Sequence, residues 1–252
     1  MSDEGELIKK RLRELYQRSI GSYCYTYTDF LGLMEQSLLS EVQKECSGMR
    51  YECFGGVAGA ERVVVRFGDA EELGYDEPYP ISVIQISPKA QKYADTLTHR
   101  DFLGSLMNLG IERECLGDIA IVDNVGYLFC LEKIAEYITG SLTKIKHTDV
   151  VSRVVTELPD APLYKTERRT VQVSGERLDA IIARAFSLSR DDAQRLFARG
   201  LVFLSGREIT SPAKAPKCGD VISVRGHGRF IYHGEKSLSK KGKLNVEIEV
   251  YV

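Results

Sequence analysis

Two proline-containing segments divide this sequence and limit the size of what can fold between them. Glu77-Pro78-Tyr79-Pro80 and Leu158-Pro159-Asp160-Ala161-Pro162 each interrupt the pattern of apolar residues. A proline pushes its predecessor into an extended conformation, so regular structure is expected to stop at both places. The chain has 252 residues, enough for two or three small domains. We predict an α+β protein with an N-terminal α/β region over residues 1–76, a second domain over 77–157 and a third over 165–252.

The middle section has the most regular order of predicted elements. Its apolar patterns predict strands at 81–86, 118–122, 126–131 and 149–156, with helices at 89–109 and 133–142. Strand–helix–strand–strand–helix–strand is the ferredoxin-like order, which RNA-recognition modules share. Tyr127 and Phe129 alternate on one of these strands. They are either residues that stack on bases or residues of the core.

The first section reads as two helices followed by a hairpin. Leu7, Ile8, Leu12 and Leu15 form an apolar stripe at helical spacing, and a second helix is expected to begin near Thr28-Asp29. The strand-like runs 49–54 and 62–67 flank Gly55-Gly56-Val57-Ala58-Gly59-Ala60. These glycines partly match a phosphate-binding loop, but such a loop opens a helix, and here a β-branched strand follows. We therefore predict a glycine-rich turn between two strands.

The net charge of −2 conceals an uneven distribution of charge. Residues 165–252 hold 17 Lys and Arg against 10 Asp and Glu, whereas the rest hold 17 against 26. A basic segment on an acidic body indicates a local surface that binds a polyanion. A solvated tail explains Lys236, Lys240, Lys241 and Lys243, but it does not explain the arginines before them.

Those arginines fall on a predicted helix. Helices are expected at 175–186 and 190–200 and strands at 201–204 and 220–224, with 229–232 and 244–252 as candidate extensions of the small sheet. Ser189 can cap the second helix, on which Arg195 and Arg199 share a face while Ala193, Leu196 and Phe197 face inward. Guanidinium groups at fixed spacing suit the phosphates of folded RNA, although arginines that merely solvate a surface helix are the alternative. The predicted RNA-binding residues are Arg177, Ser189, Arg190, Gln194, Arg195, Arg199, Arg207, Lys214 and Arg229, and His99 and Arg100 are a candidate second contact.

This part of the chain resembles the S4 (alpha-L) RNA-binding domain. The match rests on Arg177-Leu178-Asp179, Ser189-Arg190 and Gly219-Asp220 in the order and spacing of that family, while Ser205 stands where an Asn is common. Arg-Leu-Asp also carries the catalytic aspartate of pseudouridine synthases. Only 73 residues follow Asp179, too few for their catalytic domain. We predict instead that Asp179 is a helix N-terminal residue in a favourable position for the helix dipole.

The whole chain resembles the YlmH-type family. The resemblance rests on Phe54-Gly55-Gly56 with Gly59-Ala60-Glu61-Arg62, on the run from His99 to Arg113, on Gly117-Asp118-Ile119, and on Gly228-Arg229-Phe230 with Lys241-Gly242-Lys243. Gly32-Leu33-Met34 departs from the more polar run expected there. The resemblance implies a central ferredoxin-like RNA-binding domain before the S4 domain. It also implies ribosome-associated quality control on large ribosomal subunits obstructed by peptidyl-tRNA.

Other classes of function find little support in the sequence. The six cysteines form no C-x-x-C pair, no ligand spacing recurs for a metal, and no catalytic constellation is evident. No signal peptide or apolar run of about 20 residues is seen, so we expect a cytoplasmic protein without membrane contact. We expect no enzymatic activity and no small-molecule cofactor; the partners would be rRNA of the large ribosomal subunit and peptidyl-tRNA. An RNA-modifying enzyme and a cell-division scaffold are the alternatives.

Overall fold

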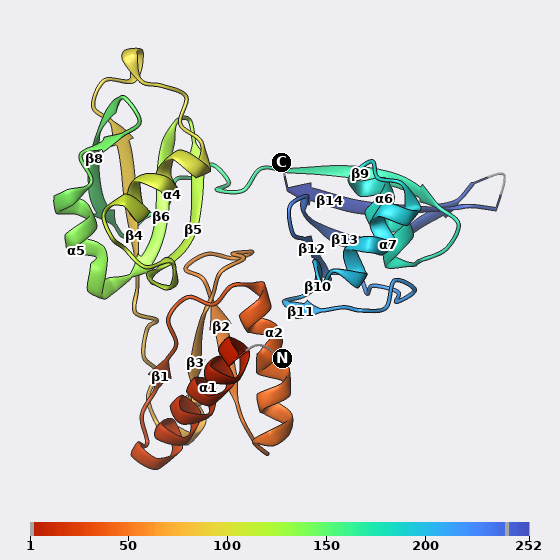
Figure 1. Cartoon of the computed structure of the whole chain (residues 1–252), viewed down its shortest axis with the longest axis horizontal. Helices are drawn as coiled ribbons and strands as arrows, with labels where there is room; N and C mark the ends of the chain where they lie inside the picture. The colour runs from red at the N-terminus through yellow and green to blue at the C-terminus, as the bar shows by residue number, and fades with distance from the viewer. Residues whose placement is uncertain (1–2, 240–241, 252) are drawn as a thin grey trace. The chain divides into compact units, whose positions relative to one another are not determined.

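The computed structural model describes residues 3–239 and 242–251 and divides into two compact units, Met1–Leu163 and Tyr164–Val252 (Figure 1). Both units combine helices with antiparallel sheets. The division falls directly after the second proline-containing segment, whereas a further boundary at residue 76 stays a prediction. Lys240 and Lys241, two lysines of the basic tail, lie outside the described residues.

The first unit begins with two long helices on a three-stranded sheet of order β1-β3-β2. Leu12 and Leu15 of the first helix are buried against the sheet, but Leu7 is exposed, so the predicted apolar stripe is shorter than its pattern. The elements are α1 (Asp3–Ser22), β1 (Thr26–Tyr27), α2 (Leu33–Glu45), β2 (Tyr51–Phe54), β3 (Val64–Phe67) and the short α3 (Ala70–Leu73).

The predicted start of the second helix near Thr28-Asp29 is wrong. The Thr28 hydroxyl accepts a hydrogen bond from the Val65 backbone N–H at 2.9 Å, so it joins the sheet and does not cap a helix. Leu31 N–H donates to the Val63 carbonyl at 2.7 Å, which keeps the segment extended. Helix α2 starts only at Leu33, and Phe30 is left free to pack elsewhere.

A five-stranded antiparallel sheet of order β5-β6-β4-β8-β7 forms the rest of the first unit. Ile84 and Ile86 of β4 are fully buried together with Phe102 and Leu106 of α4 and Ile138 of α5, so both helices pack on the same face. The elements are β4 (Ile81–Pro88), η1 (Gln91–Tyr93), α4 (His99–Asn108), η2 (Arg113–Cys115), β5 (Leu116–Val122), β6 (Val125–Leu131), α5 (Glu132–Ser141), β7 (Lys144–Ile145) and β8 (Thr148–Val155).

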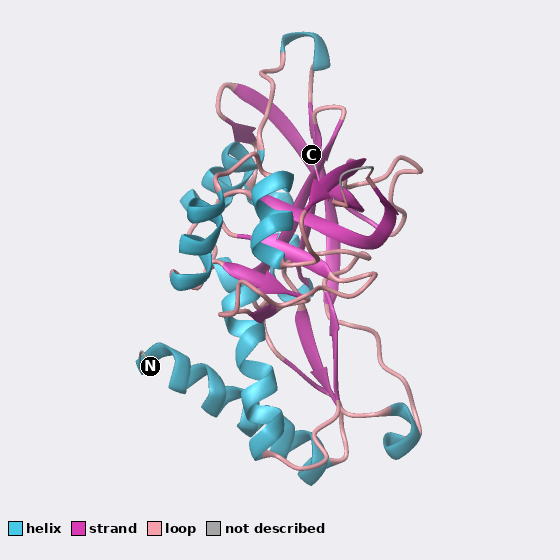
Figure 2. Ribbon diagram, turned by 90° about the vertical axis from the view of Figure 1, so that its right-hand side faces the viewer, coloured by secondary structure: helices cyan, strands magenta, loops and turns pink. Residues whose placement is uncertain are grey.

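The predicted helix over 89–109 is half its expected length. Residues 89–98 form an irregular segment with one 3-10 turn, which reaches beyond the end of the sheet (Figures 1 and 2). The helix begins at His99 because the Asp101 carboxylate accepts hydrogen bonds from the Thr98 backbone N–H and hydroxyl. A capping box at Thr98 therefore sets the start of α4.

The other face of the five-stranded sheet is also covered. Phe129 of β6 is fully buried against Phe30 and Val64, which come from the start of the chain. Gly56 has φ of +91°, and a Cβ there would lie 2.3 Å from the Phe129 ring. The glycines therefore serve a close approach between chain segments, which agrees with the predicted turn and not with a phosphate loop.

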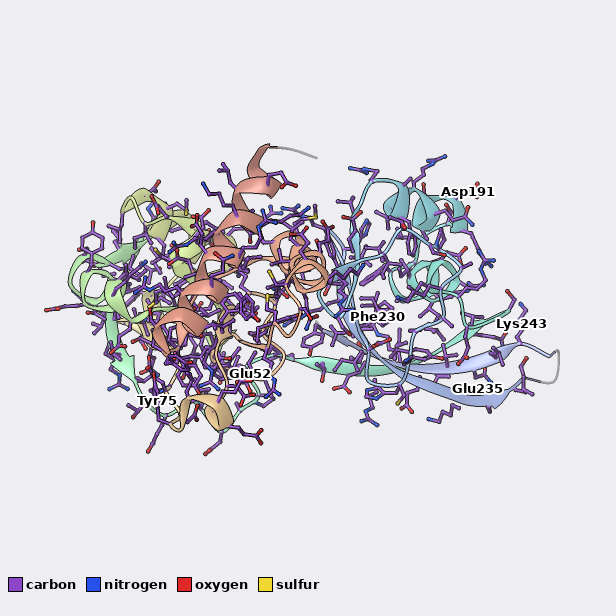
Figure 3. All side chains as sticks on the ribbon, turned by 90° about the horizontal axis from the view of Figure 1, so that it is seen from below. Glu52, Tyr75, Asp191, Phe230, Glu235 and Lys243 are labelled. Atoms are coloured by element: carbon purple, nitrogen blue, oxygen red, sulfur yellow. The ribbon has the colours of Figure 1, made fainter. Side chains whose placement is uncertain are left out.

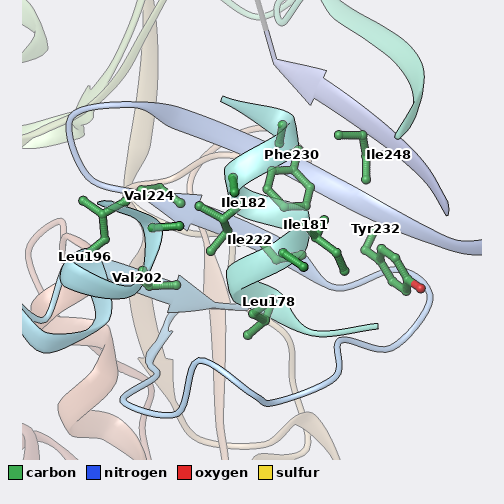
Figure 4. Packing of buried hydrophobic residues seen from close by; sticks show 14 of the residues in the cluster. Leu178, Ile181, Ile182, Leu196, Val202, Ile222, Val224, Phe230, Tyr232 and Ile248 are labelled. Atoms are coloured by element: carbon green, nitrogen blue, oxygen red, sulfur yellow. The ribbon is translucent and has the colours of Figure 1, made fainter. Parts of the chain in front are cut away.

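The second unit packs two helices on a six-stranded sheet of order β11-β10-β12-β13-β14-β9. Leu178, Ile181 and Ile182 of the first of these helices meet Phe230 and Ile248 of the sheet (Figure 4). Seven of the eight residues of that helix are buried, so it forms the centre of the core. The elements are β9 (Thr166–Val173), α6 (Leu178–Ala185), α7 (Arg190–Ala198), β10 (Val202–Leu204), β11 (Arg207–Glu208), β12 (Val221–Val224), β13 (Gly228–Leu238) and β14 (Leu244–Tyr251).

The outermost strand, β9, was not predicted. Its sequence Thr-Glu-Arg-Arg-Thr-Val-Gln-Val has almost no apolar alternation, because most of its side chains are exposed at the edge of the sheet. It pairs along its whole length with β14, from Thr166 opposite Tyr251 to Val173 opposite Leu244. Strand β13 runs far past its predicted extension over 229–232, whereas β14 lies within the predicted 244–252; together they form an arm on which Glu235 and Lys243 lie (Figure 3).

Candidate nucleic-acid interface

Asp179 organises the basic residues of the second unit. Its side chain is fully buried at the start of α6, and it accepts hydrogen bonds from Arg177, Arg190 and Gln194. The Arg177 contacts measure 3.1 and 2.9 Å, that of Gln194 3.0 Å and the shorter Arg190 contact 3.2 Å. Burial alone would raise the pKa of Asp179, but these three donors outweigh it and lower the pKa to about 2. An ionised carboxylate therefore holds three predicted RNA-binding side chains in place.

Helix α7 presents its remaining arginines to solvent. Ser189 caps the helix as predicted, since its hydroxyl accepts from the Asp192 backbone N–H at 3.0 Å. Ala193, Leu196 and Phe197 are buried, which confirms the predicted inward side. Arg195 is 74% exposed and makes one ion pair, with Asp192 at 3.2 Å. Arg199 is exposed, and no other described residue pairs with its side chain.

The segment after β10 approaches the same end of α6. The carbonyls of Lys214 and Pro212 accept from the backbone N–H groups of Leu178 and Asp179 at 3.0 and 3.1 Å. These bonds provide acceptors for the first N–H groups of α6, which have no partner within the helix. They also anchor the loop beside the Asp179 cluster, which we define as Asp179 with Arg177, Arg190 and Gln194. The side chains of Arg207 and Lys214 are exposed.

Arg229 does not join this group. Only 9% of Arg229 is exposed, and its guanidinium lies 4.8 Å from the Tyr164 ring centre and 4.0 Å from that of Tyr251. A cation held between two aromatic rings is a packing contact. We therefore correct the prediction for Arg229: its burial assigns it to holding Tyr164, the first residue of the unit, on the sheet.

The two residues of the predicted second contact are both exposed. His99 and Arg100 both lie in the first turn of α4. Desolvation, and then the nearby Arg113 guanidinium, lower the pKa of His99 from its ordinary value. Both residues remain available.

The aromatic pair on β6 belongs to the core. Phe129 has no exposed surface and Tyr127 is 8% exposed, with its hydroxyl accepting from the Gln85 side chain at 3.1 Å. The interpretation of these two residues as core residues holds, and base stacking on them is excluded in this fold.

Comparison with known proteins finds similarity to one family. Residues 75–157 match the family model described as "Putative RNA-binding domain in YlmH". The chain is 29% identical over 233 residues to "Ribosome-associated protein quality control protein P2" of Bacillus subtilis (strain 168), covering 90% of this chain and 88% of that protein. Over most of its length the chain is therefore similar to YlmH-type proteins.

Further similarities cover smaller parts of the chain. Small ribosomal subunit protein uS4 of Solidesulfovibrio magneticus is 37% identical over 70 residues, which is 26% of this chain and 34% of that protein. The uS4 protein of Borrelia hermsii is 29% identical over 94 residues, or 34% and 41% of the two chains. A solved structure, the cell division protein ylmH from Streptococcus pneumoniae, is 24% identical with a TM-score of 0.48 and covers 62% of this chain and 93% of its own.

The motif residues that this chain shares with the family in its first unit make structural contacts. Arg62 donates to the carbonyls of Leu116 and Phe30, each at 2.8 Å. The Asp118 carboxylate accepts from the backbone N–H groups of Glu61 and Arg62 at 2.8 and 3.0 Å. These hydrogen bonds hold the glycine-rich turn and the chain start against the five-stranded sheet.

The role of Asp179 is the main feature that sequence reasoning missed. The residue does lie in the first turn of α6, but it acts as a buried hydrogen-bond acceptor for three side chains. One signal was present in the sequence: a charged residue between Leu178 and Ala180-Ile181-Ile182 requires buried partners. Among residues 3–239 and 242–251, no cluster of His, Cys, Asp or Glu suits a metal ion. No helix in the described part of the chain is long and apolar enough to cross a membrane.

Proposed function

We propose that this chain is a non-enzymatic RNA-binding protein, and that its second unit is an S4 domain that contacts rRNA of the large ribosomal subunit. The observation that carries this proposal is the Asp179 cluster. It fixes Arg177, at the start of α6, together with Arg190 and Gln194 of α7, while Arg195 and Arg199 extend from α7 into solvent. Arginines positioned before binding lose less side-chain entropy when they meet phosphates.

The proposed contact set combines these residues with their neighbours. Lys214 stands on the loop that is anchored at the start of α6, Arg207 lies in the short strand β11 before that loop, and Ser189 holds the start of α7. Each phosphate that these cations neutralise releases counterions, so affinity should fall steeply with salt. The set is Arg177, Ser189, Arg190, Gln194, Arg195, Arg199, Arg207 and Lys214.

We also propose that the five-stranded sheet of the first unit is a ferredoxin-like domain over residues 77–157, following a separate region over 1–76. The support is its element order β4-α4-β5-β6-α5-β8 with both helices on one face. His99 and Arg100 are exposed there and together remain the candidate second RNA contact. Once one contact has formed, the second site meets the same RNA at a high effective concentration. Two contacts in one chain would therefore strengthen binding.

The ribosomal part of the proposal rests on similarity. A relative aligned over most of the chain is named for ribosome-associated quality control, and uS4 proteins are ribosomal. We infer the same setting here: a cytoplasmic protein that binds large subunits carrying peptidyl-tRNA during rescue of stalled nascent chains. Neither of these relatives is named as an enzyme, which supports a role in binding.

Sucrose-gradient sedimentation of a lysate at low and high salt tests the proposal. We expect the chain to migrate with large subunits at low salt and to leave them at high salt. Replacing Arg195 and Arg199 together with Ala should abolish migration with large subunits, whereas Arg184→Ala, an exposed arginine on α6, should leave it unchanged. Absence from large subunits at low salt would reject the ribosomal setting, and a chemical change in the bound RNA would favour a modifying enzyme.

A further inference from the structure

The face of the first unit's sheet that an RNA-recognition domain uses for base stacking is closed in this chain. Phe129 and Leu131 of β6 are buried under Phe30 and Val64. RNA-recognition sheets stack bases on aromatic side chains of that face. If the domain over 75–157 contacts RNA, its aromatic contact must therefore lie elsewhere.

One aromatic residue of the domain, Tyr93, is exposed to solvent. Tyr93 is 82% exposed, more than any other large apolar or aromatic residue in the described part of the chain. It ends the 3-10 turn Gln91–Tyr93, in the segment that reaches beyond the sheet between β4 and α4 (Figures 1 and 2). The ammonium of Lys92 lies 5.7 Å from the Tyr93 ring centre, and Lys89 is exposed nearby in the sequence.

The segment that carries Tyr93 is held at both ends. Lys89 N–H donates to the Asp149 carbonyl and the Gln91 side chain donates to the Asp123 carbonyl, both at 2.9 Å. On the far side, Leu97 N–H donates to the Asn124 side chain at 2.8 Å and Asp95 N–H to the Thr148 hydroxyl at 2.9 Å. Two neighbouring turns of the sheet thus fix the segment, so the exposed ring is presented on an ordered support.

We propose that Tyr93 is a stacking platform for an unpaired base of RNA, with the Lys92 ammonium beside the ring to meet the adjoining phosphate. This inference rests on the proposed function, since it names a second contact on the same RNA. An exposed ring on a fixed support binds a base face without ordering a loop first. It is also independent of sequence, because every base has such a face.

Charge at this end of the sheet is balanced, and this separates the contact from the arginine face. Lys89, Lys92 and Lys146 stand near the acidic residues Asp95, Asp123 and Asp149. Stacking must then supply most of the affinity, and the one phosphate contact of Lys92 should contribute only about 0.7 to the salt slope.

The chain contains no Trp, which gives a direct test. Tyr93→Trp would carry the sole indole of this 252-residue chain, and a base stacked on it quenches its fluorescence. The probes are one RNA hairpin with a blunt end and the same hairpin with a single-stranded adenosine tail. We expect the tailed hairpin to quench Tyr93→Trp more than the blunt one. Tyr23→Trp, a 77% exposed position of the same unit, should show no difference between them.

Affinities of unlabelled variants complete the test. Tyr93→Ala should weaken binding of the tailed hairpin about 5- to 100-fold with an unchanged salt slope, and Tyr93→Phe should retain it. Equal affinity of Tyr93→Ala and the parent for the tailed hairpin, with no quenching, would overturn the inference while RNA binding through the arginines stands. Failure of the parent to bind either hairpin would overturn both. Emission that changes on intact large subunits, but neither on the tailed hairpin nor on protein-free rRNA of the large subunit, would assign Tyr93 to a protein partner and reject base stacking.

Discussion

The guanidinium of Arg177 and the buried carboxylate of Asp179 form a two-point pair, with Nε–Oδ1 and Nη2–Oδ2 distances of 3.1 and 2.9 Å. The arginine side chain is still 44% exposed, whereas the carboxylate has no exposed surface. Asp179 therefore belongs to the core, whereas Arg177 partly faces solvent. This arrangement links the stability of the second unit to the shape of its proposed RNA-binding face.

Asp179→Asn tests that link. An amide keeps the size of the side chain but cannot accept from three donors as a carboxylate does, so the free energy of unfolding should fall by about 1–3 kcal/mol. RNA affinity should fall as well, because Arg177 and Arg190 lose their anchor. Urea unfolding and hairpin binding measure the two effects. Asp191→Asn, at an exposed position on α7, is the control and should change neither.

The same residue predicts a dependence of stability on pH. The pKa of Asp179 is about 2 in the folded chain, below its value near 3.9 in an unfolded chain. Its contribution is therefore complete above about pH 4 and is lost as the pH falls towards 2, with a size of about 1–2 kcal/mol. Unfolding of the parent and of Asp179→Asn at pH 7 and pH 3 should show their difference shrinking at low pH. A constant difference would show that ionisation of Asp179 does not stabilise the fold.

Arg195 and Arg199 should control the salt dependence of binding. Removing one phosphate contact lowers the slope of log affinity against log salt by about 0.7–0.9, so the double Ala variant should lower it by up to about 2. Stability should be unchanged, because both side chains are exposed. Binding titrations over a range of salt concentrations measure the slope, with Arg184→Ala as the matched control. An unaltered slope would remove these two residues from the proposed interface.

Replacing Arg229 should lower the stability of the fold and leave the salt dependence of RNA binding unchanged. Arg229→Ala leaves Tyr164 and Tyr251 without the cation between them, which should cost about 1–2 kcal/mol of stability. Arg229→Lys should recover part of that stability because it restores a cation. The salt slope of RNA binding should stay the same in both variants. A lower slope in Arg229→Ala would return Arg229 to the contact set.

Gly56 and Gly48 form a matched pair for the close approach at Phe129. Both have positive φ, of +91° and +81°, but a Cβ at Gly48 meets nothing within 4 Å. Gly48→Ala should cost about 1 kcal/mol for backbone strain, whereas Gly56→Ala should cost about 2–4 kcal/mol because it also meets the Phe129 ring. Thermal unfolding of the full chain compares them. Equal destabilisation would show that the ring yields to the added methyl group.

Local patterns predicted the elements whose apolar residues all face one way. Helix α7 is an example, because Ser189, Ala193, Leu196 and Phe197 fix its cap and its inward face. Strand β9 was missed because it is stabilised by backbone pairing with β14, and its side chains carry no apolar pattern. The first part of the helix predicted over 89–109 is wrong for a related reason. Residues 89–98 are held in an irregular conformation by partners distant in sequence, such as Thr148 and Asn124.

The candidate site shows the same limit. Charge and spacing identified the arginines of α7, but they did not separate a side chain that faces solvent from one that faces a buried acid. Arg195 and Arg190 look alike in the sequence, yet only Arg190 reaches Asp179. Arg229 is hidden by two tyrosines that lie far from one another along the chain. Such distinctions depend on contacts between distant segments.

Strand β9 has a consequence for how the protein is made. Val173 and Leu244 are neighbours in the sheet, but residues 174 to 243 must be synthesised before the two can pair. The helices and central strands of the unit connect through short loops and can assemble while the chain is still growing. Strand β9 is instead the first strand of the second unit to leave the ribosome, and it stays unpaired until β14 has been synthesised. Completing the second unit is therefore a separate, late step of its biosynthesis.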